Sequence, residues 1–250
     1  MPRKSLLSIL IFSLPFIILL CSNRSVTNTE SDVHYIKEFS KTWNLTANAD
    51  SIHSSFEAEV QFIRCLQDSV ICKIVHTEIP HKYFGDLSYY YNNRKGFCYD
   101  RSVLMEKILS YYRFPFRHIY LSFGSGDSKP SLFDLLKKST TSHALFEVKT
   151  VNGWMAVGSN ANWIGITPDG KLLTITDVRE KLQRGTMALK YKFDNTRVFW
   201  KEKGSNFTVV YGLYSRHGDF FNNDKSTTAS ILSSPGFLPD YNLRMLLDNF

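Results

Sequence analysis

Residues 95–102 read Lys-Gly-Phe-Cys-Tyr-Asp-Arg-Ser and place a glycine turn directly before a cysteine. Five apolar residues then recur at helical spacing: Val103, Leu104, Ile108, Leu109 and Tyr112. This pattern predicts a helix over residues 99–113 with Cys98 at its start. The N–H groups and the positive dipole end of a helix N-terminus stabilise a thiolate, which is the nucleophilic form of cysteine. Cys98 is therefore a candidate for covalent catalysis, and its alternative is a buried structural thiol.

A second informative block begins at Ser142 and reads Ser-His-Ala-Leu-Phe-Glu-Val, with an Asn-Gly turn and Trp154 after it. Its apolar residues predict strands over residues 143–151 and 153–158, with His143 at the start of the first. A histidine can take the proton of a cysteine thiol and later return it to a leaving group. We expect the Cys98 sulfur to lie within about 4 Å of a His143 ring nitrogen.

Together the two blocks resemble the transglutaminase-like superfamily. In that family, Gly-x-Cys precedes a helix, and His-x-x-x-Glu-Val is followed by a turn, a tryptophan and an aspartate four residues later. The matching positions here are Gly96, Cys98, His143, Glu147, Val148 and Trp154. The resemblance covers residues 94 to 160 and implies a papain-like, transglutaminase-like core with catalysis by cysteine and histidine.

The sequence departs from this family where the aspartate is expected, because Gly158 occupies that position. A side-chain amide can also orient an imidazole, by accepting its N–H. We therefore predict Asn160 as the third catalytic residue, with Ser159 and Asn162 as alternatives. If the strand continues to residue 160, alternation places Gly158 and Asn160 on one face. A catalytically inactive site with no third residue is the other possibility.

The remaining patterns predict further helices and strands in one domain at residues 33–250. The predicted helices are 56–76, 130–138, 177–182 and 242–247; the predicted strands are 116–123, 190–198 and 207–213, with a hairpin over 164–176. Helices come first and strands later. This order predicts an α+β fold in which N-terminal helices pack on one face of an antiparallel sheet.

The first 21 residues have the features of an export segment. Arg3 and Lys4 precede an uncharged apolar stretch at residues 6–20, and Cys21 follows it. This resembles a bacterial lipoprotein signal, in which the cysteine is acylated. Because Leu20 occupies the place usual for a small residue, an ordinary cleaved signal and an uncleaved anchor stay open. Residues 22–32 are polar and predict a flexible tether, and we expect a protein of the cell envelope, lipid-anchored at Cys21, or a secreted one.

Composition limits the partners and the cofactors. The chain has 250 residues, 43% hydrophobic and 21% charged, which is typical of a globular protein and excludes a multi-span membrane protein. Its net charge of +7 is not concentrated in a basic run, so we expect no nucleic-acid partner. No His-Glu-x-x-His, Cys-x-x-Cys or nucleotide-binding loop occurs, so we expect neither metal nor cofactor.

Two further cysteines, Cys65 and Cys72, lie on the predicted helix at 56–76. On an unbroken helix they are two turns, roughly 10 Å, apart, which is beyond disulfide reach. A break at Asp68-Ser69 would make pairing possible. We expect both thiols to be buried as small hydrophobic groups.

These features predict an exported enzyme that transfers acyl groups through a thiol. Cys98 would attack a peptide or carboxamide carbonyl of a peptide or protein substrate, His143 would take the thiol proton, and Asn160 would hold the imidazole. Water as acceptor makes the enzyme a protease or amidase, and an amine makes it a crosslinking transferase; the sequence leaves both open. The alternative is an inactive transglutaminase-like binding module anchored at the cell envelope. A hydroxyl among Tyr89 to Tyr91 could join the Cys98 N–H in an oxyanion hole.

Overall fold

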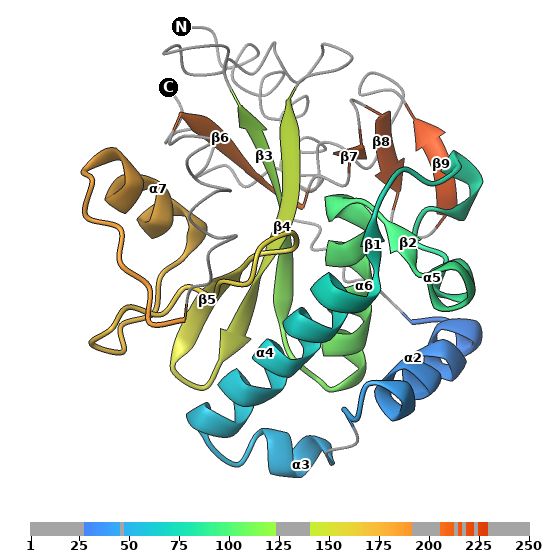
Figure 1. Cartoon of the computed structure of the whole chain (residues 1–250), viewed down its shortest axis with the longest axis horizontal. Helices are drawn as coiled ribbons and strands as arrows, with labels where there is room; N and C mark the ends of the chain where they lie inside the picture. Colours follow the sequence, from blue (N-terminus) through green and yellow to red (C-terminus); the bar gives the residue numbers. More distant parts are fainter. Residues whose placement is uncertain are drawn as a thin grey trace, which may run out of the picture.

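A computed structural model of the whole chain provides the fold (Figure 1). It describes residues 28–45, 48–123, 141–191, 206–212, 215–216, 219–222 and 225–229. The export segment with Cys21, the helices expected at 130–138 and 242–247, and all but the first two residues of the strand expected at 190–198 lie outside these ranges. The described part is mixed helix and antiparallel sheet, and the α+β class is confirmed.

Helices dominate the first half of the described chain, and strands dominate the second half. The helices are α2 (Glu30–Thr42), α3 (Ala49–Ile52), α4 (Phe56–Lys73), α5 (Leu87–Asn93), α6 (Cys98–Tyr111) and α7 (Ile175–Gln183), with a 3-10 turn η1 (His81–Tyr83). The strands are β1 (Val75–His76), β2 (Lys95–Gly96), β3 (Phe116–Phe123), β4 (Ser142–Thr150), β5 (Gly153–Val157), β6 (Phe207–Tyr211), β7 (Ser215–Arg216), β8 (Asp219–Asn222) and β9 (Lys225–Ala229).

The main sheet has four antiparallel strands in the order β5-β4-β3-β6. Its register pairs Leu121 of β3 with His143 of β4, and Phe146 of β4 with Val157 of β5. A separate parallel pair joins β1 to β2, with His76 opposite Gly96. This pair brings the segment after α4 beside the residues that precede Cys98.

Apolar residues cover both faces of the main sheet. One face packs against the N-terminal helices, as predicted, through Ile36, Phe39, Ile63, Leu66, Leu104, Ile108, Phe146 and Val148. The other face packs against α7 and the loop before it, through Ile119, Leu121, Leu145, Trp163, Leu173, Ile175 and Val178. Figure 1 shows α4 and α6 crossing in front of β4, with α7 on the far side of β5 from them.

The sequence did not predict α2, and the expected tether at residues 22–32 is wrong for its last residues. The Thr29 hydroxyl oxygen accepts the Asp32 N–H, and the Asp32 carboxylate accepts the Thr29 N–H. Together these two bonds form a capping box at the start of the helix. Ile36 and Phe39 are fully buried against the core. Ile36, Phe39 and Trp43 recur at helical spacing, so the apolar face of this helix is present in the sequence and was overlooked.

The expected burial of Cys65 and Cys72 is also wrong, because both are exposed free thiols on α4. The helix is unbroken at Asp68-Ser69. Its core face is formed instead by Val60, Ile63, Leu66 and Val70. Both thiols are thus accessible to reagents.

Candidate functional site

Cys98 is the first residue of α6, as the sequence predicted, and its side chain is half-buried against the helical core. The helix start is fixed by Asp100, which accepts the Phe97 N–H at 2.8 Å. Gly96 allows this close approach, since a Cβ there would lie 2.7 Å from the Cβ of Asp100. Gly96 lies on strand β2 and not in the predicted turn, and its small size is a packing requirement of the cysteine position.

Tyr90 supports the same carboxylate from α5. Its hydroxyl donates to Asp100 Oδ1 at 2.9 Å and accepts the Gly85 N–H at 2.7 Å. Burial, followed by the negative charge of Asp100, raises the pKa of Tyr90 well above its usual value, so the phenol stays a neutral donor. Of the three tyrosines considered for an oxyanion hole, Tyr90 is thus engaged in fixing the helix start.

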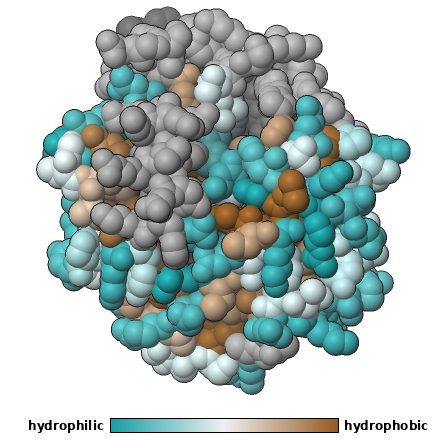
Figure 2. All heavy atoms as spheres, in the orientation of Figure 1, coloured by the Kyte–Doolittle hydropathy of each residue, from teal (hydrophilic) through white to brown (hydrophobic). Residues whose placement is uncertain are grey.

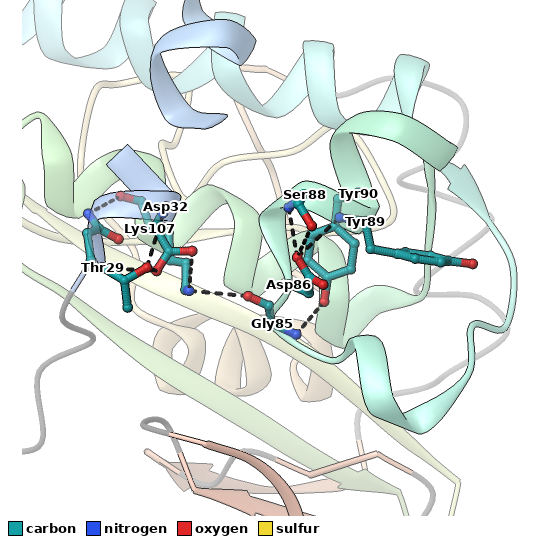
Figure 3. Close-up of polar contacts among 9 residues, drawn as sticks. Thr29, Asp32, Gly85, Asp86, Ser88, Tyr89, Tyr90 and Lys107 are labelled. Carbon is teal, nitrogen blue, oxygen red and sulfur yellow. Dashed lines mark hydrogen bonds and ion pairs between the residues drawn. The ribbon is translucent and has the colours of Figure 1, made fainter. Parts of the chain in front are cut away.

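An ion pair fixes the later turns of α6. Lys107 Nζ lies 2.8 Å from Asp32 Oδ1 of α2 and donates to the Gly85 carbonyl at 3.2 Å. Figure 3 shows Lys107 between Thr29 and Asp32 on one side and Gly85 with Tyr90 on the other. Both ends of α6 are therefore connected to the loop around Gly85.

We expect Asp100→Ala to lower the free energy of unfolding by about 1–2 kcal/mol, because a capping carboxylate is lost. It should also change the rate at which iodoacetamide alkylates Cys98, measured by mass spectrometry. Asp177→Ala is the matched control, since Asp177 occupies the same capping-box position in α7. Equal alkylation of Cys98 in both variants would contradict a role for Asp100 at the thiol.

Arg101 provides a fixed cation near Cys98. It is 5% exposed, and its guanidinium donates from Nε to the Ile74 carbonyl at 3.2 Å and from Nη1 to Asn160 Oδ1 at 3.2 Å. Burial lowers the pKa of Arg101, and the nearby Cys98 and Cys72 raise it by a smaller amount. Cys98 and Cys72 are thus both within electrostatic range of this buried guanidinium.

His143 is the second residue of β4 and is 3% exposed. Ser159 Oγ lies 3.4 Å from its Nε2 and donates to the Ala144 carbonyl at 2.5 Å. A hydroxyl has one hydrogen, and here the Ala144 carbonyl receives it. Ser159 can therefore accept a hydrogen bond from the Nε2–H of His143, and a neutral imidazole that donates from Nε2 has its lone pair on Nδ1.

Asn160, the predicted third catalytic residue, contacts residues other than His143 with both the oxygen and the nitrogen of its carboxamide. Its Oδ1 accepts from Arg101, and its Nδ2 lies 3.1 Å from His76 Nε2. Its role at His143 stays a prediction, and the observed geometry favours Ser159. The other alternative, Asn162, donates to Asp68 of α4 at 2.6 Å.

The turn after β5 explains why the family's aspartate has no counterpart here. The strand ends at Val157, so the condition under which alternation would place Gly158 and Asn160 on one face is not met. Gln67 Nε2 donates to the Gly158 and Trp163 carbonyls at 2.7 and 2.8 Å. A Cβ on Gly158 would lie 2.6 Å from both the Ala161 carbonyl oxygen and Trp163 Nε1. A side chain at position 158 would therefore require these atoms to move.

We accordingly expect Gly158→Asp to destabilise the fold and not to restore a family-type triad. Overpacking of this kind costs about 1–3 kcal/mol, or more where backbone atoms must move. The measurement is the urea midpoint of the variant beside Gly170→Asp, a turn position where nothing lies within 4 Å of a Cβ but φ is +86°. A Gly158→Asp variant at least as stable as wild type would refute the steric account.

Glu147, another family-matching residue, is fully buried at the opposite side of β4 from the helices. It accepts from Arg117 and from the Ile175 N–H, which starts α7. Burial raises the pKa of Glu147, and burial together with the Glu147 charge raises the pKa of Tyr211 to about 12. Arg117 lies 4.4 and 4.5 Å from the ring centroids of Trp154 and Tyr211. This cluster joins α7 to the sheet.

Two contacts join α6 and β4 to the turn after β5. Cys98 and Arg101 are one turn apart on α6 and so share a face. Arg101 contacts Asn160, and the neighbouring Ser159 contacts His143. Sequence reasoning missed Gln67 and His76, because their contacts join residues more than 80 positions apart and leave no spacing signal.

The rest of the described structure adds no further chemistry to this site. Within the described ranges, no group of three or more His, Cys, Asp or Glu side chains is arranged to hold a metal ion. Nor does the part of the chain that the structure describes contain a helix long and apolar enough to cross a membrane. On the face in Figure 2, hydrophilic side chains cover most of the described surface, and a small apolar group lies near its centre.

The chain matches no protein-family model. It also matches no curated protein.

Proposed function

We propose that this protein is an exported thiol-dependent acyl-transfer enzyme with a papain-like, transglutaminase-like core. Cys98 is its nucleophile and His143 its general base. The observation that carries the proposal is that Arg101, one turn after Cys98 on α6, contacts Asn160, while the neighbouring Ser159 contacts His143. These two contacts bring the start of α6 and the start of β4 to the same turn after β5.

In the proposed reaction, the Cys98 thiol gives its proton to His143 Nδ1 as the sulfur attacks a substrate carbonyl carbon. The tetrahedral intermediate collapses when its carbon–nitrogen bond breaks, and the departing amine takes the proton from His143. A thioester to Cys98 remains. Water, deprotonated by the same imidazole, releases the acyl group as an acid in a hydrolase, whereas an amine acceptor gives a new amide in a transferase.

Ser159 supports the direction of this proton transfer. Because Ser159 accepts the Nε2–H, the lone pair of His143 lies on Nδ1, where a thiol proton can be received. In this arrangement, Ser159 orients the imidazole of His143. In the family that the sequence resembles, an acid or an amide has this role. Asn160 remains the alternative for the same part.

The Ser159→Ala and Asn160→Ala variants distinguish these two residues. We expect Ser159→Ala to slow acylation by an ester substrate by about ten- to a few hundredfold, since nucleophile and base remain but the tautomer is no longer fixed. Stopped-flow acylation rates, with circular dichroism as the folding control, provide the measurement. A silent Ser159→Ala beside a severe Asn160→Ala, with the pH dependence of Cys98 alkylation shifted, would restore Asn160 to the histidine-orienting role.

A second candidate function is a binding module that no longer turns over. The observation in its favour is Gly158, where the family has an aspartate and a side chain would require neighbouring atoms to move. Slow, pH-independent alkylation of Cys98 together with peptide binding would support this candidate.

The N-terminal proposal is tested separately, by mass spectrometry of membrane-fraction protein. A chain that begins at lipidated Cys21 is expected, and an intact Met1 on cytosolic protein would refute export.

A further inference from the structure

The turn after β5 is built around one side chain of α4, the helix that crosses in front of β4 (Figure 1). Gln67 is 2% exposed, and its Nε2 donates to the Gly158 carbonyl at 2.7 Å and to the Trp163 carbonyl at 2.8 Å. The Ala161 carbonyl lies 3.5 Å from the same nitrogen. An amide nitrogen has two hydrogens, and the two shorter contacts use both of them. These carbonyls thus converge on the amide of Gln67.

A second contact joins the same helix to this turn. Asp68, the next residue of α4, accepts from Asn162 at 2.6 Å. Within the turn, the Gly158 N–H donates to the Trp163 carbonyl at 3.1 Å and closes the backbone on itself. Buried carbonyl groups that lose their donor are costly, and water has little access to a side chain as buried as Gln67. The shape of the turn therefore depends on this glutamine.

The turn carries the two residues considered for orienting the imidazole. Ser159 is fully buried, and its Oγ lies 3.4 Å from His143 Nε2. Asn160, next to it, accepts from Arg101. A distance of 3.4 Å is near the upper end for a hydrogen bond, so a small movement of the turn away from β4 would break the contact of the serine with the imidazole.

We propose that Gln67 is a positioning residue for the base of the proposed reaction, His143. By holding the turn at residues 158–163, Gln67 keeps Ser159 where the serine can accept the Nε2–H of the imidazole. This inference rests on the proposed function, since it assigns Gln67 to the base of that reaction. In this role Gln67 acts through the turn and not through the substrate. Its loss should therefore slow the chemical step and leave substrate binding unchanged.

The variant Gln67→Met tests this role, because methionine has a similar length and no hydrogen-bond donor. We expect it to lower kcat for an ester substrate by about ten- to a hundredfold, the cost of a misplaced catalytic group, with KM unchanged. The pH dependence of acylation should shift in the same direction as in Ser159→Ala, because both variants alter the hydrogen bond at Nε2. Gln67→Asn, whose amide is one methylene shorter, should show a smaller loss of the same kind.

Two other residues of α4 provide matched controls. Gln61 is an exposed glutamine, so Gln61→Met should behave as wild type. Val70 is a fully buried apolar residue of the same helix. Val70→Ala should lower the urea midpoint through the cavity that it leaves, while the pH dependence of acylation stays that of wild type. A purely structural role of Gln67 would make Gln67→Met resemble Val70→Ala.

The deciding experiment is a double-mutant cycle of Gln67→Met and Ser159→Ala, read by stopped-flow acylation with circular dichroism as the folding control. We expect Gln67→Met to add little or no loss once Ser159 is alanine, because its effect passes through the serine hydroxyl. Additive losses, or wild-type kcat and pH dependence in Gln67→Met, would overturn the inference. Non-additivity with Asn160→Ala instead would also overturn it, since the turn would then act through Arg101.

A failure of the proposed function is a separate result. If Cys98→Ala keeps its activity and no acyl adduct forms on Cys98 in wild type, the acylation mechanism fails whatever Gln67→Met does. If Cys98 is acylated and the cycle is additive, the mechanism stands and only the assignment of Gln67 is wrong.

Discussion

Cys98→Ala is expected to abolish turnover and thioester formation while the protein folds as wild type. The sulfur is the only protein atom in the proposed reaction that forms a covalent bond to the acyl carbon, so its loss should lower kcat by at least about a thousandfold. Acyl transfer from a chromogenic ester and intact mass after substrate addition are the measurements. The acyl adduct seen with wild type should be missing in the variant.

The chain supplies its own controls for this experiment. Cys65→Ala and Cys72→Ala remove exposed thiols on α4 and should leave kcat unchanged. An acyl adduct on Cys65 or Cys72, with activity retained in Cys98→Ala, would contradict the assignment of the nucleophile.

His143→Ala is expected to have the second largest effect. Removal of the base should slow acylation by about 10²–10⁴-fold, the contribution typical of general acid–base catalysis. The loss should be greatest near neutral pH and smaller at alkaline pH, where hydroxide can deprotonate the thiol. Single-turnover acylation from about pH 5 to 9 measures this dependence.

His118→Ala separates the loss of catalysis from a loss of packing. His118 is a buried β3 histidine that lies 2.6 Å from Glu106 and takes no part in the proposed reaction. We expect this variant to lose stability, with the pH dependence of acylation kept. A His143→Ala variant whose pH dependence matches that of wild type would show that His143 is not the base.

The regular part of the fold could be predicted from local patterns. Alternating residues gave β3 its observed bounds, and the helical spacing after Cys98 gave α6 to within two residues. The helix α2 was missed although Ile36, Phe39 and Trp43 have helical spacing. The tether expected up to residue 32 covers the first turn of this helix, so its start at Glu30 was not recognised.

The candidate site could be predicted only as far as its strands and helices are regular. Cys98 and His143 stand at element starts, where motif and pattern agree. The third position depends on the bend after Val157, which Gln67 holds from another helix, and strand alternation no longer applies there. The contacts of Asn160 with Arg101 and His76 join three segments that are distant in the sequence. Such contacts produce no regular spacing of residues, so the sequence alone could not predict them.

The most direct test of the central claim is the rate of Cys98 alkylation by iodoacetamide from about pH 5 to 9, resolved by peptide mass spectrometry. The exposed Cys65 and Cys72 provide internal references in the same digest. A thiolate stabilised by a helix N-terminus, Arg101 and an imidazole should react faster at about pH 6 than either reference, and His143→Ala should remove this advantage. Reaction of Cys98 no faster than the references at that pH, unchanged in His143→Ala, would contradict the proposed Cys98–His143 site.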